Sequence, residues 1–242
     1  DVTYPLRALA ARTPNRRLAR GRVDNIDQRA RVVTLDDRRE LEYDYLLLAQ
    51  GATTNYFGIP GAAEHTHALY TRADALRVRD YVFGVLEAAA AATEPPSCLR
   101  VTIIGGGPTG VETAGALAEL NSVRGHFFPE LTHVPTEVTL VEQLPTLLNG
   151  FAEESQEFAA HQLQARGVAI RTGTAVAEVH RNGILVADGN FTPSDVTIWA
   201  AGVTIGTTPG EWGFPQGKGG RVPVQKDLRV RGSREVFAAG DI

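Results

Sequence analysis

The spacing of apolar and polar residues along this chain predicts that strands and helices alternate. Nearly continuous apolar runs are typical of strands that are buried on both faces of a parallel sheet. Four such runs occupy residues 100–104, 137–142, 168–171 and 196–200. Three longer segments are expected to be helices. In 72–92 the apolar residues have the spacing of an amphipathic helix, 108–120 is rich in alanine, and 152–165 ends at Gly167. The order of these segments predicts a βαβαβ unit with a parallel sheet.

Shorter patterns predict the remaining elements. Residues 19–24 and 31–35 are expected to be strands, with a turn between them at 25–29. A more apolar run at 43–49 indicates a further strand buried in a parallel sheet. Three segments separated by Asn-Gly and Asp-Gly dipeptides predict an antiparallel meander, over 174–180, 183–187 and 190–192. Residues 121–136 have little helical periodicity, and we expect an irregular insertion there.

The composition is that of a globular protein with one large or two ordinary domains, because 242 residues with 43% hydrophobic content can bury a sizeable core. A net charge of -4 argues against a nucleic-acid partner. No apolar stretch approaches the roughly 18 residues of a membrane span, and the chain has no signal-peptide layout. Cys98 is the single cysteine, so no disulfide can form within the chain and a cytoplasmic setting is expected.

The most informative motif is Gly105-Gly106-Gly107-Pro108-Thr109-Gly110, where the predicted strand at 100–104 turns into the predicted helix at 108–120. In such a turn the first glycine permits the tight bend, the second lets the backbone approach a pyrophosphate, and the third lets the helix pack closely on the strand. The free N–H groups of the helix N-terminus then face the phosphates. The motif predicts a dinucleotide site, and the alternative is a glycine-rich turn that binds nothing.

Glu142, at the end of the predicted strand 137–142, is the expected acidic partner of the dinucleotide. A carboxylate at this position accepts hydrogen bonds from both hydroxyls of the adenosine ribose and repels a 2′-phosphate. We therefore expect NADH to bind in preference to NADPH. The alternative is a solvated charge at the end of a strand.

An apolar run followed by alanine and glycine occurs three times, at 46–51, 198–202 and 236–240. Each copy is expected to be a strand that ends where the backbone comes close to a ligand. The candidate ligand-binding residues at these ends are Ala49, Gly51, Ala201, Gly202 and Gly240. Ordinary strand-to-loop chemistry explains any single copy, and the repetition favours a shared role.

Together these motifs resemble the pyridine nucleotide-disulfide oxidoreductase superfamily of flavoproteins, and within it the type II NADH dehydrogenases. Residues 105–112 (GGGPTGVE) are similar to the family's NADH fingerprint, 198–203 (IWAAGV) to its return strand and 237–241 (FAAGD) to its second FAD motif. The segment Asn55-Tyr56-Phe57-Gly58-Ile59-Pro60-Gly61 is more similar to type II dehydrogenases than to disulfide or ferredoxin reductases. The resemblance covers nearly the whole chain.

The resemblance implies an α/β fold in which a Rossmann-like NAD-binding domain, with its small antiparallel meander, is inserted in an incomplete FAD-binding domain of the two-dinucleotide-binding flavoprotein type. We expect residues 1–71 to be a partial FAD-binding domain, 72–203 the NAD(H)-binding domain and 204–242 the return to the FAD-binding domain. The implied reaction is hydride transfer from NADH to FAD and then to a membrane quinone.

The resemblance also implies two further site residues. Asp241 matches the residue that binds the ribityl chain of the flavin. Glu112 matches the glutamate near the nicotinamide and flavin, so we expect it to orient the reacting rings as the catalytic residue. The alternative for Glu112 is a glutamate that is only stabilised by the helix dipole.

The chain departs from the family pattern in two places. Residues 1–20 hold no glycine motif, where the family has its first FAD fingerprint, and the chain ends at Ile242, before the family's quinone-site segment and amphipathic membrane helix. We therefore expect a fragment that binds NADH weakly or moderately, lacks FAD and has no NADH:quinone activity. The longer parent is expected to bind FAD and quinone and to associate peripherally with the cytoplasmic face of the membrane. Whether the parent is a homodimer is left open.

Two other interpretations stay open. A ferredoxin or rubredoxin reductase shares every glycine motif, and only the segment 55–61 and the quinone-site segment separate it from a type II dehydrogenase. A module that senses NAD(H) without turnover differs by lacking flavin in the full-length protein. No metal site is expected, because His65 and His67 are the only two histidines near metal-ligand spacing and they lie in a predicted loop.

Overall fold

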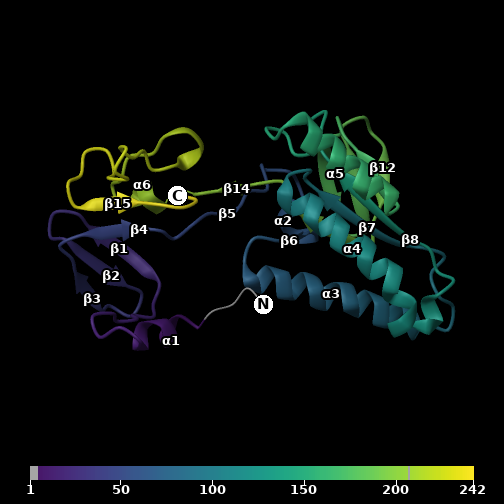
Figure 1. Ribbon diagram of the computed structural model, residues 1–242, viewed down its shortest axis with the longest axis horizontal. Coiled ribbons are helices and arrows are strands. Elements are labelled where there is room, and N and C mark those ends of the chain that lie inside the picture. Colours follow the sequence, from purple (N-terminus) through teal and green to yellow (C-terminus); the bar gives the residue numbers. More distant parts are fainter. Residues whose placement is uncertain (1–4, 207) are drawn as a thin grey trace. The chain divides into compact units, whose positions relative to one another are not determined.

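The computed structural model describes residues 5–206 and 208–242, which form two compact units (Figure 1). The central unit is the continuous segment Thr53–Thr204, and the flanking unit combines the chain up to Ala52 with Ile205–Ile242. Residues 53–71, which we expected to belong with the first segment, instead pack in the central unit. There the N–H of Val179 donates a hydrogen bond to the carbonyl oxygen of Pro60 (2.9 Å).

The core of the central unit is a five-stranded parallel sheet in the order β6-β13-β7-β8-β9. Its strands are β6 (His67–Ala68), β7 (Leu99–Ile104), β8 (Thr136–Val141), β9 (Val168–Arg171) and β13 (Val196–Trp199). The four longer strands lie where the apolar runs predicted them. The predicted βαβαβ unit with a parallel sheet is therefore confirmed.

Three helices pack on one face of this sheet, α3 (Arg72–Ala90), α4 (Pro108–Phe127) and α5 (Glu153–Ala165). Side chains alternate along a strand, so Ile103 of β7 and Leu140 of β8 both point to the helices, and both are fully buried. The apolar stripes of the helices cover this face and produce the main core. Within the described part of the chain, no helix is long and apolar enough to cross a membrane.

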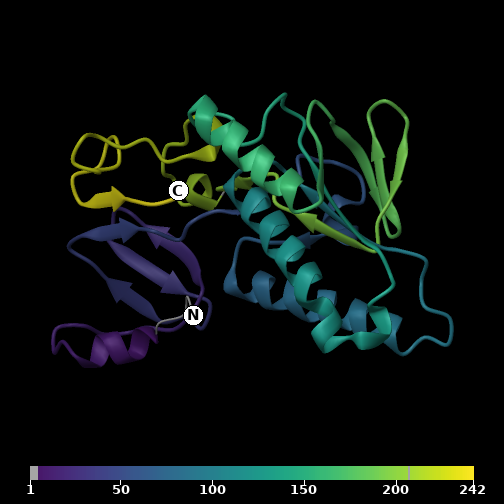
Figure 2. The ribbon, with the colours of Figure 1, turned by 45° about the vertical axis from the view of Figure 1, so that its right-hand side comes forward.

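The predicted meander lies on the other side of the sheet (Figure 2). It consists of β10 (Val176–His180), β11 (Gly183–Val186) and β12 (Phe191–Pro193), which pair in antiparallel order. Ile184 of the meander packs against Ile104, Val141 and Trp199 at the ends of the sheet strands. Trp199 is 1% exposed, as expected for a core residue. Because the sheet is covered on both faces, its strands read as nearly continuous apolar runs.

Helix α4 is longer than predicted and runs to Phe127, so the first part of the expected irregular insertion is helical. The reason is Arg124, whose side chain is buried and donates hydrogen bonds to the carbonyl oxygens of Leu131 (3.0 Å) and Val134 (2.6 Å). These bonds tie the last turns of α4 to the 3-10 helix η1 (Pro129–Leu131) and the loop after it. A buried arginine does not appear in the spacing of apolar residues, so the helix predicted from that spacing ended too early.

The flanking unit contains a three-stranded antiparallel sheet in the order β1-β2-β3, a parallel pair of strands and short helical segments. The strands are β1 (Val23–Asp27), β2 (Val32–Leu35), β3 (Glu40–Glu42), β4 (Leu46–Leu48) and β15 (Val236–Ala238). The helical segments are α1 (Leu6–Ala11), α6 (Thr208–Glu211) and η2 (Lys218–Gly220). Ile26, Leu35, Leu48 and Val236 are buried in the core of this unit.

Two predictions for the flanking unit are wrong in detail. Strand β1 includes most of the expected turn at 25–29, because the turn begins only at Asp27. The carboxylate of Asp27 accepts hydrogen bonds from the N–H groups of Arg29 and Ala30. The strand expected over 43–49 covers three residues, and its central Leu47 is 58% exposed. Strand β4 is therefore buried on one face and open on the other.

Three short elements complete the central unit. Strands β5 (Thr53–Thr54) and β14 (Val203–Thr204) pair in antiparallel orientation at its two ends. The chain therefore enters and leaves this unit along two paired segments. Helix α2 (Ala62–His65) lies between β5 and β6 in the chain. Its first residue, Ala62, is fully buried in the cluster beneath the meander.

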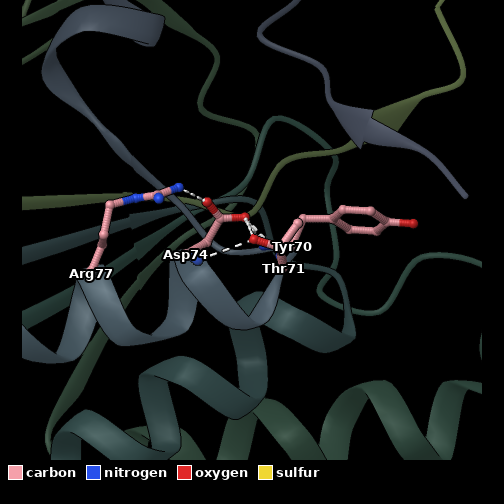
Figure 3. A network of polar contacts seen from close by, with 4 residues as sticks. All are labelled: Tyr70, Thr71, Asp74 and Arg77. Carbon is pink, nitrogen blue, oxygen red and sulfur yellow. Dashed lines mark hydrogen bonds and ion pairs between the residues drawn. The ribbon is translucent and has the colours of Figure 1, made fainter. Parts of the chain in front are cut away.

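Helix α3 begins with a capping box at Thr71 and Asp74 (Figure 3). The N–H of Asp74 donates to Oγ1 of Thr71 (3.1 Å), and the N–H of Thr71 donates to Oδ2 of Asp74 (2.7 Å). Arg77 pairs with the same carboxylate. Burial acts to raise the pKa of Asp74, but hydrogen bonds from Thr71 and Tyr70 and the charge of Arg77 hold the pKa below its ordinary value.

We expect the Asp74→Asn variant to lose stability in a pH-dependent manner. Because the pKa of Asp74 is lower in the folded than in the unfolded chain, its ionised form stabilises the fold above about pH 4. This contribution is lost as the pH falls further, through the folded pKa. Wild type should exceed the variant by about 1 kcal/mol in unfolding free energy near neutral pH, and the difference should vanish in acid. Urea titrations at several pH values, followed by circular dichroism, measure it.

The matched control is Asp80→Asn, because Asp80 lies on the same helix with a largely exposed side chain. We expect this change to alter the unfolding free energy by less than about 0.5 kcal/mol. A difference between wild type and Asp74→Asn that stays constant from neutral pH into acid would contradict the role of the ionised carboxylate.

Candidate functional site

Three loops meet at the carboxyl ends of neighbouring strands. Ala201 lies just beyond β13, Gly105 follows β7 and Glu142 follows β8. Because these strands are adjacent and parallel in the order β13-β7-β8, the three residues come together at one edge of the sheet. They line a cavity of about 180 Å³. The rest of its wall is mainly apolar and includes Phe57, Ile59, Ile104, Val141, Val176 and Trp199.

The three glycines of the turn have different surroundings. A methyl group on Gly105, whose φ is +112°, would lie 2.5 Å from Cα of Ala201, so this position needs glycine for its conformation and for its contact with the end of the next strand. A methyl group on Gly110 would overlap the carbonyl oxygen of Gly105. A methyl group on Gly107 would meet no atom within 4 Å. Gly107 is therefore the position at which an external group has room to approach the backbone.

The N-terminus of α4 has no side chain that caps it. Gly107 is its N-cap residue, Pro108 follows, and the first turn contains no acidic residue. The other two long helices differ, because α3 is closed by its capping box and α5 begins with Glu153 and Glu154. The free N–H groups and the positive end of the α4 dipole thus favour an anion at this edge.

Glu142 lies beside the glycine turn and is held by two backbone N–H groups. Gly106 donates to Oε2 (2.6 Å), and Leu144 donates to Oε1 (2.7 Å). Each carboxylate oxygen still has a second lone pair, so the half-buried side chain can also accept hydrogen bonds from ribose hydroxyls. No sequence signal indicated the bond between Glu142 and Gly106, because it joins residues that are far apart in the chain.

The loop after Glu142 holds the turn from the other side. The N–H of Leu148 donates to the carbonyl oxygen of Gly106 (2.8 Å), and Leu148 itself has a φ of +49°, which is uncommon for leucine. The neighbouring Leu147 is buried. Both polar groups of Gly106 are therefore bonded, its N–H to Glu142 and its carbonyl to Leu148. The orientation of the glycine turn is fixed by the protein alone.

Residues 53–61 form a wall of the cavity that we did not assign to the site from the sequence. The N–H of Asn55 donates to the carbonyl oxygen of Gly202 (3.0 Å), and the indole N–H of Trp199 donates to the carbonyl oxygen of Asn55 (2.8 Å). The ring of Tyr56 packs on Trp199 with 5.5 Å between centroids, and burial raises the pKa of its hydroxyl. The motif at 55–61 was the signal that could have found this wall.

Glu112 lies on the outer surface of α4. Its side chain is exposed and lines the groove between α4 and α5, beside Gly115 and Phe158. It is not among the residues that line the cavity at the strand ends. Its orienting role toward the reacting rings stays a prediction.

The candidate residues of the flanking unit gather at one edge of the β4 and β15 pair. These strands run parallel and in register, so Ala49, Gly51, Gly240 and Asp241 all follow the same ends. Gly51 (φ +74°) and Gly240 (φ +85°) adopt the left-handed conformation that favours glycine. The third copy of the repeated pattern, with Ala201 and Gly202, lies in the central unit.

The remaining residues with reactive side chains, among them His67 and Cys98, have environments that packing explains. Among the residues that the structure describes, no group of three or more His, Cys, Asp or Glu side chains could hold a metal ion. His67 packs against Tyr81, with 4.0 Å between the ring centroids, and burial lowers the pKa of the imidazole. Cys98 is buried, and burial raises the pKa of its thiol. Cys98 therefore behaves as a small apolar side chain.

Comparison with known proteins adds a family. A family model described as pyridine nucleotide-disulphide oxidoreductase matches residues 9–242. The chain is 32% identical to a type II NADH:quinone oxidoreductase of Mycobacterium tuberculosis, in an alignment that covers 100% of this chain and 56% of that protein. It is 33% identical to the mitochondrial external alternative NAD(P)H-ubiquinone oxidoreductase B1 of Arabidopsis thaliana, covering 91% and 42%. The chain thus spans about half the length of the curated relatives it matches.

Two solved structures share the fold. The structure of NDH2 from Plasmodium falciparum in complex with NADH has a TM-score of 0.80 and 22% identity, and the match covers 90% of this chain and 48% of that chain. A ferredoxin reductase from Rhodopseudomonas palustris has a TM-score of 0.74 and 21% identity, covering 91% and 49%. These matches confirm the expected α/β flavoprotein fold, and at such identities they show the fold alone.

We expect Gly110→Ala and Gly107→Ala to differ sharply in stability. The added methyl group at Gly110 overlaps backbone of the strand end, which cannot move aside, so the unfolding free energy should fall by about 3 kcal/mol. The methyl group at Gly107 enters open space at a φ of -74°, which alanine adopts freely, so the loss should stay below about 0.5 kcal/mol. Urea titration of both variants gives the comparison. Equal losses would contradict the close packing of α4 on β7.

Proposed function

The chain belongs to the pyridine nucleotide-disulphide oxidoreductase family, and on this basis we propose that it forms the NADH-binding part of a type II NADH:quinone oxidoreductase. The observation that carries the proposal is the open space at Gly107, beside the uncapped N-terminus of α4 and the carboxylate of Glu142. A pyrophosphate fits the first two features, and a ribose diol fits the third. A glycine-rich turn that binds nothing needs neither the open space nor the uncapped helix N-terminus.

The residues of the central unit bind and orient the coenzyme. The pyrophosphate accepts hydrogen bonds from the backbone at Gly107 and the first N–H groups of α4. The adenosine ribose donates to Glu142, whose position is already fixed by Gly106 and Leu144. Because these groups are in place before binding, NADH meets a preorganised site and little ordering is needed when it binds. A 2′-phosphate would meet the negative charge of Glu142, so NADH is preferred over NADPH.

We assign the flavin to the flanking unit. Ala49, Gly51, Gly240 and Asp241 follow the ends of two parallel strands, and a side chain at Gly240 would meet no atom within 4 Å, so a ligand has room to approach there. Bound FAD supplies the acceptor for the hydride of NADH and the donor to the quinone. The 242 residues contain one glycine-x-glycine-x-x-glycine turn, and it lies in the central unit. The chain by itself therefore has an incomplete flavin site.

The quinone is the acceptor that the relatives favour. Two relatives in Mycobacterium tuberculosis, at 32% and 31% identity, are named as type II NADH:quinone oxidoreductases, and one in Arabidopsis thaliana, at 33%, as an NAD(P)H-ubiquinone oxidoreductase. The likeness to the ferredoxin reductase is 21% and concerns the fold. Because a quinone is dissolved in the bilayer, we infer that the longer protein works peripherally at the cytoplasmic face of a membrane.

We expect Glu142→Gln to weaken NADH binding and to erase the preference over NADPH. The amide keeps the size of the side chain and one oxygen acceptor for the glycine turn, but it loses the charge that strengthens the bonds to the ribose. A charge-assisted hydrogen bond contributes about 1.5 to 3 kcal/mol, so the dissociation constant for NADH should rise by roughly ten- to a hundred-fold. Isothermal titration with NADH and NADPH measures both effects.

The folded control for this experiment is Gly107→Ala, which blocks the approach of the pyrophosphate and should weaken NADH and NADPH alike. If Glu142→Gln leaves the ratio of the two affinities unchanged, Glu142 does not hold the ribose. If the wild-type chain binds neither coenzyme, the proposed function is wrong.

We expect the 242-residue chain to purify without flavin and to show no NADH:quinone reductase activity, although it binds NADH. The physical reason is the single dinucleotide turn, which serves the central unit. Visible absorbance of the purified chain and an assay with a soluble quinone analogue check both points. Stoichiometric flavin in the chain would contradict the expectation, and a full-length protein without flavin would favour an NAD(H)-sensing module instead.

A further inference from the structure

Phe57 combines two features that folding does not explain. Its φ is +51°, a left-handed conformation that is strained for a residue with a side chain. Its aromatic side chain is 59% exposed. A strained backbone persists only where the surrounding structure enforces it, and such positions concentrate at binding sites. An apolar ring held in water by a strained backbone is therefore a candidate for ligand contact.

The turn that carries Phe57 is held by hydrogen bonds on both sides. The N–H of Phe57 donates to Oδ1 of Asn55 (2.8 Å). The backbone of Asn55 is bonded in turn to Gly202 (3.0 Å) and to the indole of Trp199 (2.8 Å). Trp199 is 1% exposed, so this anchor belongs to the rigid core beneath the sheet end. The position of Phe57 is set by the sheet rather than by a free loop.

The ring of Phe57 lies over Gly202 and faces the cavity. A methyl group on Gly202 would lie 2.9 Å from Cζ of Phe57, so the ring rests on bare backbone beyond the end of β13. Phe57 lines the same cavity as Gly105, Glu142 and Ala201. An aromatic face is thereby placed at one end of the site and a carboxylate at the other.

The strand order decides which part of the coenzyme meets this ring. Glu142 follows β8, Gly105 follows β7 and Gly202 lies beyond β13, in the spatial order β8-β7-β13. With the adenosine ribose at Glu142 and the pyrophosphate at the glycine turn, the second half of the dinucleotide extends to the end of β13, about 10 Å from β8 at roughly 4.8 Å per strand. The ring at that end of NADH is the nicotinamide.

From this order we propose that Phe57 is a specificity-determining residue that packs against the nicotinamide ring and so orients it. The inference rests on the proposed NADH site and deepens it. A flat aromatic side chain favours the binding of another flat ring, because stacked or tilted ring pairs add binding free energy beyond that of the area they bury. Asn55 and Trp199 act as positioning residues, because their hydrogen bonds fix the turn that carries Phe57.

The test compares two ligands that differ only in the nicotinamide. ADP-ribose contains the adenosine, the pyrophosphate and the second ribose of NADH but lacks the nicotinamide ring. Isothermal titration of the 242-residue chain is carried out with NADH and with ADP-ribose, for wild type and Phe57→Ala. We expect Phe57→Ala to weaken NADH about tenfold and to leave the affinity for ADP-ribose within a factor of about two.

Three further variants keep the result interpretable. Phe57→Leu preserves apolar bulk without the flat ring and should behave as Phe57→Ala, whereas Phe57→Tyr should restore the affinity for NADH. Phe127→Ala is the matched control, because Phe127 is 69% exposed at the far end of α4 from the glycine turn. It should change neither affinity. Retained ADP-ribose binding also shows that each variant is folded.

Three outcomes would overturn the assignment of Phe57. Equal weakening of NADH and ADP-ribose would place Phe57 against the adenosine half or in the fold, and unchanged affinity for both would remove it from the site. Full NADH affinity in Phe57→Leu would show that only apolar bulk matters. Failure of the wild-type chain to bind NADH would instead overturn the proposed function, together with this role.

Discussion

The close packing of α4 against the end of β7 is the contact on which the site depends. The backbone of Gly110 lies so near the carbonyl oxygen of Gly105 that no side chain fits between them. This contact sets where α4 starts, and therefore where its free N–H groups and positive dipole end point. It also leaves Gly107 facing open space, one turn away from the point of closest approach. The geometry that favours an anion at this edge is thus a consequence of how closely the helix approaches the strand.

Glu142 connects this packing to recognition. Its carboxylate accepts a hydrogen bond from Gly106, so the group proposed to hold the ribose also holds the turn. The N–H of Leu148 donates to the carbonyl oxygen of the same glycine. A charge that is already bonded by backbone N–H groups needs little reorganisation when a ligand arrives, which favours affinity. The same arrangement means that removing Glu142 altogether disturbs the turn, so only a substitution that keeps the acceptor separates the two roles.

The site is asymmetric from one strand end to the next. At β8 the cavity offers a carboxylate, at β7 a bare backbone turn, and beyond β13 an aromatic ring over Gly202. These surfaces suit a sugar diol, a pyrophosphate and a flat ring, in that spatial order. Because neighbouring parallel strands are spaced evenly, the sheet holds the carboxylate, the backbone turn and the aromatic ring at fixed separations. The meander contributes Val176 to the apolar wall of the cavity, beside Ile104, Val141 and Trp199.

The sequence by itself determined the periodic features of this protein. Strands buried on both faces and amphipathic helices leave direct marks in the spacing of apolar residues, and the turn from Gly105 to Gly110 marks itself through residue types that only a tight turn requires. Glu142 could be predicted for the same reason, as the residue that ends the next strand. Only the tertiary structure decided the length of α4, the one-sided burial of β4, the hydrogen bonds of Gly106 and Asn55, and the position of the Phe57 ring. Each of these depends on a hydrogen bond or a packing contact between residues distant in the chain, and no local pattern records which distant groups will meet.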